Sequence, residues 1–244
     1  MVRASIPKAL PMRHAVLAFV APLLLVACGQ ANPVKSALKA PPPAPPPPTL
    51  SCAAPFLKAA SAASLAQAFG GANVTEETVP GPEGSQNNAT VIYAADATRR
   101  IEVLWANDAA RTTLLYASIE QHAPDITTTV IGPLGLQIGD TVEEVEAING
   151  GGFALTAFDQ DNGGSVLDWK GGRIGREPCT VTVEFAPTNQ TYSSVRGDTL
   201  FPSDSSAMRM ARPTVARIGI GYPAAPAPVP PTAATDATAK DETP

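Results

Sequence analysis

The stretch AFDQDNGGSVLDW, residues 157–169, groups acids, an amide and paired glycines between two short apolar runs. Asp159 and Asp161 have the i, i+2 spacing of the first two ligands in a calcium-binding loop. Such a loop also needs an oxygen ligand at its fifth position and a bidentate Glu at its twelfth, where this chain has Gly163 and Lys170. A calcium site is therefore the weaker interpretation, and we expect no metal here.

The same stretch fits the turn of a β-hairpin without any ligand. Its Asp-Asn-Gly-Gly segment supplies residues that tolerate positive φ, and β-forming residues flank it on both sides. In a hairpin, Phe158 and Trp169 would be core or cross-strand partners. Asp159, Asp161 and Trp169 are then candidates for a surface turn that contacts a binding partner.

The histidine and motif content argues against the common catalytic sites. The chain has only His14 and His122, and His14 lies in the N-terminal leader described below. One remaining histidine cannot form a His-based metal cluster, and it offers a single candidate base to a Ser or Cys nucleophile. His122 lies in the polar segment EQHAPD, so we expect a solvated loop residue. The sequence has no G-x-S-x-G, no H-E-x-x-H and no phosphate or dinucleotide loop, so we expect no catalytic residue and no cofactor.

Paired carboxylates are the remaining catalytic option. Glu143 with Glu146, or Asp159 with Asp161, could in principle serve glycoside cleavage. The two glutamates lie on a predicted helix whose apolar face is already explained, so a solvated helix face is the simpler interpretation. A carboxylate-dependent envelope hydrolase is therefore an alternative and not the leading hypothesis.

The N-terminus has the features of a secretory signal. Arg3, Lys8 and Arg13 precede an uncharged run from Ala15 to Ala27. This run is too short to span a bilayer as a helix, but it fits the apolar core of a signal peptide. We therefore expect a signal peptide over residues 1–27.

The end of that run, LVAC at Leu25–Cys28, resembles the bacterial lipobox. The resemblance implies cleavage before Cys28 and attachment of a diacylglycerol, with further acyl chains such as palmitate. Burial of about 0.8 kcal/mol per methylene makes several chains a lasting anchor. Gly29 replaces the Asp that retains such lipoproteins at the inner membrane, which implies the outer membrane of a Gram-negative bacterium, facing the periplasm. The alternative is an ordinary transmembrane or cleaved signal with an incidental cysteine.

Low-complexity segments bound the expected folded region. Residues 28–50 contain the cysteine and APPPAPPPPTL, which extends at about 3.1 Å per residue and is typical of a stalk. Residues 223–244 contain mostly Pro, Ala and Thr, which predicts a disordered tail. A globular domain is therefore expected over residues 51–222.

Two cysteines remain inside this domain. In an oxidising periplasm Cys52 and Cys179 are a candidate disulfide, which would close a loop of more than a hundred residues. A chain-entropy estimate gives such a bond about 4 to 5 kcal/mol. Two separate buried thiols are the alternative, because spacing alone does not show that the residues approach each other.

The net charge excludes one class of partner. Without the three basic residues of the leader, 14 Lys and Arg stand against 22 Asp and Glu, which gives a net charge of −8. Nucleic acid requires a basic surface that replaces the phosphate counterions, so we expect no nucleic-acid partner.

Two short helices have clear end signals. In DTVEEVEAING, Thr141 is the expected N-cap and Gly150 lies just past the end. In SAASLAQAFGG, Ser61 is the expected N-cap and Gly70 the terminator. The two stretches align with each other, which suggests an internal duplication; chance similarity of two capped helices is the alternative.

Strand-like runs follow each helix and predict the fold class. They are ATVIYAA, RRIEVLWAN, TTLLYASIE, ITTTVIG, FALTAF, GSVLDW, CTVTVEF and TVARIGIGY. We therefore expect an α+β domain of mostly antiparallel sheet with short helices. Two related helix-plus-sheet units would cover about residues 51–125 and 126–222, with TEETVPGPEGSQNN as an insertion in the first.

Three blocks of the chain resemble a group of uncharacterised bacterial envelope proteins. They are RRIEVLWANDAAR, IGDTVEEVEAINGGGFALTAFDQDNGGSVLDWKGGRI and VRGDTLFPSDSSAMRMARPTVARIGIGY, so the resemblance covers most of residues 52–222. The family pattern has aromatic residues beside the Asp of the Gly-Gly turn, where this chain has Gln160 and Asn162. More loosely, the helix-then-hairpin unit is similar to modules of outer-membrane assembly lipoproteins and of the beta-lactamase inhibitory protein, which bind other proteins. The resemblance therefore predicts a fold, and it does not predict any particular activity.

These features lead to one expected function and two alternatives. The leading hypothesis is a lipid-anchored, periplasm-facing, non-enzymatic protein that presents an α+β domain for a binding or structural role in the envelope. Its expected partners are the membrane, through the lipid, and another envelope protein. The alternatives are the carboxylate-dependent hydrolase and a module that binds a small ligand or an ion.

Overall fold

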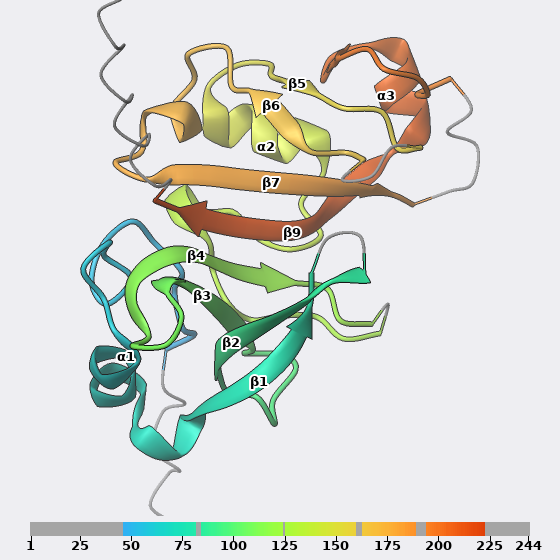
Figure 1. Cartoon of the computed structure of the whole chain (residues 1–244). Helices are drawn as coiled ribbons and strands as arrows, with labels where there is room; N and C mark the ends of the chain where they lie inside the picture. Colours follow the sequence, from blue (N-terminus) through green and yellow to red (C-terminus); the bar gives the residue numbers. More distant parts are fainter. Residues whose placement is uncertain (1–45, 82–83, 124, 160–162, 189–193, 223–244) are drawn as a thin grey trace, which may run out of the picture. The chain divides into compact units, whose positions relative to one another are not determined.

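The computed structural model describes residues 46–81, 84–123, 125–159, 163–188 and 194–222 (Figure 1). Across these ranges the chain has nine strands in mostly antiparallel sheets and three short helices, so the α+β prediction is confirmed. The expected signal peptide, Cys28, most of the stalk and the tail lie outside the described residues, as does Asp161.

Six strands form one antiparallel sheet in the order β1-β2-β3-β4-β9-β7. Their bounds are Val74–Pro80 (β1), Gln86–Ile92 (β2), Ile101–Asn107 (β3), Thr112–Glu120 (β4), Pro213–Gly221 (β9) and Thr180–Pro187 (β7). A second sheet has the order β6-β5-β8, with bounds Val166–Asp168 (β6), Ala154–Leu155 (β5) and Phe201–Pro202 (β8). A single antiparallel bridge, Ser165 to Glu184, connects β6 to the edge of β7.

Two of the three helices, α1 and α2, begin at the residues that their predicted caps indicate. The bounds are Ala62–Phe69 (α1), Val142–Asn149 (α2) and Ser206–Ala211 (α3), with 3-10 turns at Gly71–Asn73 (η1), Pro133–Gly135 (η3) and Ile174–Arg176 (η4). Ser61 and Thr141 each cap a helix through a capping box. Gly150 ends α2 in the left-handed conformation, which glycine adopts without steric cost.

The two halves of the described chain differ in strand order, but their first helices are attached alike. From the central pair β4 and β9 outward, the first half runs β4-β3-β2-β1 within one sheet, whereas the second runs β9-β7 and continues only through the Ser165–Glu184 bridge to the separate sheet β6-β5-β8. The residue before each N-cap makes the same hydrogen bond to the central strands. The carbonyl of Ala60 accepts from the amide of Thr113 on β4 at 3.0 Å, and the carbonyl of Asp140 accepts from the amide of Val215 on β9 at 2.8 Å. The two helix–sheet junctions therefore have the same local geometry, and an internal duplication stays a hypothesis.

One face of the six-stranded sheet supports the main core. Inward side chains such as Trp105, Leu114 and Ile218 pack in one cluster with α1 through Leu65 and with α2 through Val145. Both halves contribute to this cluster, so the core is shared between them. The last residue of the expected stalk, Leu50, is fully buried in it, which extends the folded region into that segment.

Some elements differ from the sequence prediction. The run ITTTVIG forms no strand and makes only a single parallel bridge between Ile131 and Thr49. The predicted insertion TEETVPGPEGSQNN contains most of β1 and the start of β2. Tertiary pairing decides both cases, because a polar edge strand such as β1 needs only one hydrogen-bonded neighbour and no apolar run.

Candidate functional site

The face of the six-stranded sheet opposite the main core has polar side chains over β3, β4, β9 and β7, beside a small apolar cluster of Val79, Ala89 and Val91 on β1 and β2, and we call it the open face. On β3 and β4, Glu102 is paired with Ser118 and Leu104 with Tyr116. Side chains alternate between the two faces of a strand, so these residues point away from the buried Ile101, Val103 and Ile119. Gly219 and Arg217 of β9 and Thr182 and Glu184 of β7 continue the same rows across the sheet.

Two arginines organise the carboxylates of the open face. Arg217 donates through Nε to Glu120 at 2.9 Å and lies 3.5 Å from Glu184 on the neighbouring strand. Arg100, just before β3, contacts Glu77 and Glu102, each at 2.8 Å. Each arginine therefore joins two carboxylates and holds their positions on the sheet.

Tyr116 crosses the centre of this face. Its hydroxyl lies 3.0 Å from Oγ1 of Thr182, two strands away. This path exists because Gly219 lies between them, and a Cβ at that position would come within 2.1 Å of the tyrosine oxygen. Burial raises the pKa of Tyr116 above its ordinary value, against a lowering by the Thr182 hydrogen bond. The phenol is therefore neutral at physiological pH and can donate or accept a hydrogen bond.

Two hollows lie on this face on either side of Arg217. One of about 400 Å³ is lined by residues including Glu102, Leu104, Tyr116 and Glu120. The other, of about 260 Å³, is lined by residues including Tyr116, Leu167 and Thr182. Strands and their connections supply the lining residues of both hollows. The open face is thus hollowed, and charged and aromatic groups lie together in it.

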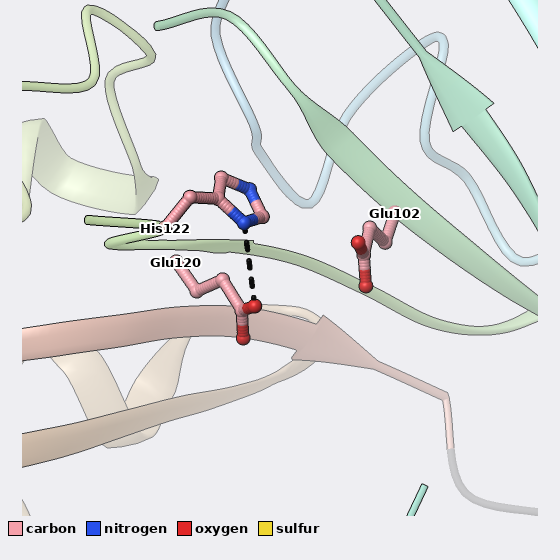
Figure 2. Close-up of side chains that lie close together, drawn as sticks. All are labelled: Glu102, Glu120 and His122. Atoms are coloured by element: carbon pink, nitrogen blue, oxygen red, sulfur yellow. Dashed lines mark ion pairs between the residues drawn. The ribbon is translucent and has the colours of Figure 1, made fainter. Parts of the chain in front are cut away.

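Glu102, Glu120 and His122 converge beside the larger hollow (Figure 2). One ligand-type atom from each side chain lies within 4.8 Å of those of the other two. Nδ1 of His122 lies 3.5 Å from Oε1 of Glu120, and the exposed fractions of the two side chains are 22% and 30%. We refer to these three residues as the Glu-Glu-His cluster.

The sequence did not reveal this cluster. It predicted a solvated loop residue at His122, because the histidine lies in the polar segment EQHAPD. The available signal was the alternation of β4, in which Ser118, Glu120 and the position of His122 continue one face. The pairing of β3 with β4, which adds Glu102, is a tertiary feature.

The sequence-predicted hairpin turn has a structural role in the fold. β5 and β6 pair antiparallel on either side of the Asp-Asn-Gly-Gly segment, as the hairpin interpretation predicted, while Asp161 and Asn162 lie outside the described residues. Oδ1 of Asp159 accepts a hydrogen bond from the amide of Gly197 at 3.1 Å. Nε1 of Trp169 donates to the carbonyl of Val181 at 3.3 Å, and its ring lies 5.4 Å from that of Phe153. These contacts do not direct Asp159 and Trp169 to a common ligand.

The predicted acid pair on α2 is also held by structural contacts. Arg209 of α3 pairs with Glu143 and, at 2.8 Å, with Glu146. The hydroxyl of Ser203 donates to Glu146 at 2.6 Å. A hydrogen bond to its own backbone amide, together with Arg209, lowers the pKa of Glu143 against a smaller desolvation effect. This pair docks α3 against α2, and an ionised pair of this kind is unsuited to act as a proton donor.

The two cysteines of the domain are joined. Cys52 and Cys179 form a disulfide with their Cα atoms 5.5 Å apart. Both are nearly buried in the main core, and the bond links the first segment of the fold to β7. The disulfide therefore has a structural role in the domain.

Comparison with known proteins identifies no relative. No protein-family model, no curated protein and no solved structure matches the chain. Among the described residues, no helix is both long enough and apolar enough to cross a bilayer.

Proposed function

We propose that this chain is a lipoprotein of the Gram-negative envelope whose folded domain has a non-catalytic binding or structural role. The observation that carries the proposal is the LVAC sequence at Leu25–Cys28, behind a basic and then apolar leader. The lipid on Cys28 would tie the chain to the outer membrane. The eight residues 40–47 of the proline-rich segment, which precede the part that joins the fold, would add a spacer of roughly 25 Å between lipid and domain.

The open face is the surface that we assign to binding. Its charged side chains are fixed by cross-strand ion pairs, and its two hollows lie beside the half-buried Tyr116. A preorganised, mixed surface of this kind is typical of interfaces that form and separate, because tyrosine and arginine are enriched in them. The proposed partner is a second envelope protein that presents complementary charges.

The arrangement of acids favours this role over the carboxylate-dependent hydrolase. A glycosidase needs one protonated carboxylic acid that donates to the leaving group. Glu102 and Glu120 each pair with an arginine, and Glu143 and Glu146 share a third, so all four contacts require the ionised form. The hydrolase remains the alternative to test.

The anchoring part is tested with a Cys28→Ser variant in the native envelope. Cells grown with labelled palmitate should incorporate label into the parent chain and not into the variant. The parent should also fractionate with the outer membrane. A parent chain that takes up no label and is recovered in the soluble periplasmic fraction would contradict the proposal.

The binding part is tested by cross-linking in the envelope followed by capture. Arg217→Glu reverses the central charge of the open face, and Arg176→Glu is the matched control in η4. A partner that is captured by the parent and by the control, but lost with Arg217→Glu, supports the assigned surface. Turnover of a cell-wall polymer by the purified chain would refute the non-catalytic role and support the hydrolase.

A further inference from the structure

We propose that the Glu-Glu-His cluster binds a divalent transition-metal cation, for which zinc is the probe. The inference goes beyond the proposed function and does not depend on the lipid anchor or on a protein partner. It starts from the three side chains that Figure 2 shows around one space: Glu102 from β3, Glu120 from the end of β4, and His122 two residues later.

The distance between His122 and Glu120 is close to that of two ligands around one metal ion and is longer than a direct hydrogen bond. A distance of 3.5 Å between Nδ1 of His122 and Oε1 of Glu120 exceeds the usual range of an N–H···O bond. Two ligands about 2.0 to 2.1 Å from a tetrahedral zinc ion lie about 3.3 Å apart, which is close to the observed value. The third side chain, Glu102, places an oxygen within the same 4.8 Å limit.

The arginines hold the two carboxylates without occupying both oxygens. Arg217 takes Oε2 of Glu120, which leaves Oε1 toward His122. Arg100 takes Oε1 of Glu102 through both Nε and NH2. Metal-binding carboxylates commonly have such an outer partner, because it fixes the orientation of the ligand. The cluster therefore has ligands together with the groups that orient them.

The local charge also suits a dication. The two ion-pair networks, centred on Arg100 and Arg217, contain four carboxylates, which are Glu77, Glu102, Glu120 and Glu184. Four negative and two positive groups leave an excess of two negative charges when the imidazole is neutral, as it must be to bind a metal. A bound dication would balance this excess.

The donor set selects among metals. Calcium requires six to eight oxygen ligands, whereas this cluster offers one imidazole nitrogen and two carboxylates. Imidazole with carboxylate suits zinc and neighbouring transition metals. The hollow of about 400 Å³, lined in part by Glu102 and Glu120, leaves room for a water molecule as the fourth ligand. The site is therefore of the open, three-ligand type.

The test uses the chain from residue 28 onward with Cys28→Ser, kept without reductant so that Cys52 and Cys179 remain joined and no thiol competes for zinc. This chain retains every described residue and has a single histidine, His122. Zinc chloride is titrated by calorimetry, and the imidazole resonances are followed by NMR. We expect one zinc ion per chain and a shift of the His122 signals that saturates at the same ratio.

Three variants and one control locate the site. Glu102→Gln, Glu120→Gln and His122→Gln should each weaken zinc binding by about tenfold or more, while an unchanged circular dichroism spectrum shows that they fold. Glu143→Gln is the control, because Glu143 is also paired with an arginine but lies on α2. It should bind zinc as the parent does, and calcium should bind the parent at least about tenfold more weakly than zinc.

Several outcomes would overturn the proposal. They are the absence of zinc binding, zinc binding that leaves the His122 resonances unchanged, equal affinity in all four variants, and calcium binding as tight as zinc binding. In each case the contact between His122 and Glu120 would be an ordinary ion pair at the end of a strand. The proposed envelope function would be unaffected, because its tests do not use metal.

Discussion

At the scale of single residues, the environment of each charged group decides its role. Burial lowers the pKa of Arg217, but its ion pairs with Glu120 and Glu184 outweigh that effect and raise the pKa overall. Exposed ion pairs of this kind contribute only about 0 to 1 kcal/mol to stability. The value of Arg217 therefore lies in positioning the carboxylates of the open face and not in holding the fold together.

Asp140, which precedes the cap of α2, provides a test of pH dependence. Burial raises the pKa of its carboxyl, against a lowering by the amide of Gln137, which donates to Oδ2 at 2.8 Å. Because the pKa of Asp140 is higher in the folded than in the unfolded chain, ionisation of this carboxyl lowers the free energy of unfolding at neutral pH. This loss disappears as the pH falls below the folded and then the unfolded pKa, where the carboxyl is protonated in both states. Asp140→Asn keeps an acceptor for Gln137 and removes the charge.

We expect Asp140→Asn to have a higher free energy of unfolding than the parent at pH 7, and this advantage to be smaller at pH 3. Urea denaturation of both proteins at a series of pH values measures the difference in the free energy of unfolding. A difference that grows as the pH falls would show that the carboxylate is stabilised by the fold, contrary to this assignment.

Gly219 has no side chain, and this leaves room on the open face for the hydroxyl of Tyr116 to reach Thr182. A Cβ there would come within 2.1 Å of Oη of Tyr116 and 2.6 Å of Oγ1 of Thr182. Gly219→Ala should therefore displace Tyr116, break its hydrogen bond and lower the free energy of unfolding by about 1 to 3 kcal/mol. Gly71→Ala is the control, because a Cβ at that position has no contact within 4 Å.

Chemical denaturation measures the stability loss in both glycine variants, and ultraviolet titration of the tyrosines reports on Tyr116. Equal stability of the two variants would mean that Tyr116 moves aside without cost. The hydrogen bond to Thr182 would then have no part in fixing the open face.

At the scale of elements, the caps place the two helices against the sheet. Thr141 accepts from the amide of Glu144 at 3.3 Å, and the Glu144 carboxylate accepts from the amide of Thr141 at 2.7 Å. The preceding residue, Asp140, is hydrogen-bonded to β9, so the cap joins α2 to the central strands. In the first half, Ser61 and Ala60 have the same relation to α1 and β4.

Removal of the α2 cap tests this relation. Thr141→Ala should lower the free energy of unfolding by about 1 kcal/mol, because the amide of Glu144 loses its acceptor. Thr141→Ser keeps the hydroxyl and should remain within a few tenths of a kcal/mol of the parent. Urea unfolding monitored by circular dichroism provides the comparison. A Thr141→Ser variant as unstable as Thr141→Ala would indicate that the methyl group, and not the cap, is what matters.

At the scale of the whole described domain, the two halves are held together by shared structure. β4 of the first half pairs with β9 of the second at the centre of the sheet, and one core cluster contains side chains from both. The Cys52–Cys179 disulfide, with a sequence separation of 127, adds a covalent link between them. The halves therefore do not have separate cores.

The disulfide gives the prediction at this scale. Joint replacement of Cys52 and Cys179 by Ala should lower the free energy of unfolding by about 5 kcal/mol, because the open unfolded chain gains entropy. The parent unfolded in the presence of reductant should lose a similar amount. Urea titration of the three samples measures it, and a loss below about 1 kcal/mol would show that the reduced chain retains the same restriction when unfolded.

The sequence by itself determined the local features. The end signals of α1 and α2 were correct because Ser61, Thr141 and Gly150 act on neighbouring backbone groups. The α+β class followed from apolar alternation, and the antiparallel pairing of β5 with β6 from the turn residues between them. The lipobox prediction also rests on adjacent residues, and it remains a proposal.

Only the tertiary structure decided what the strands bring together. The partners in the Glu-Glu-His cluster come from β3, β4 and the segment after it, and Arg217 reaches Glu120 from β9. No local pattern gives that order, since each strand can pair with several others at similar cost. The position of β1 and the loss of the predicted strand at ITTTVIG have the same origin. The open face therefore results from register and strand order, which depend on packing between residues far apart in the chain.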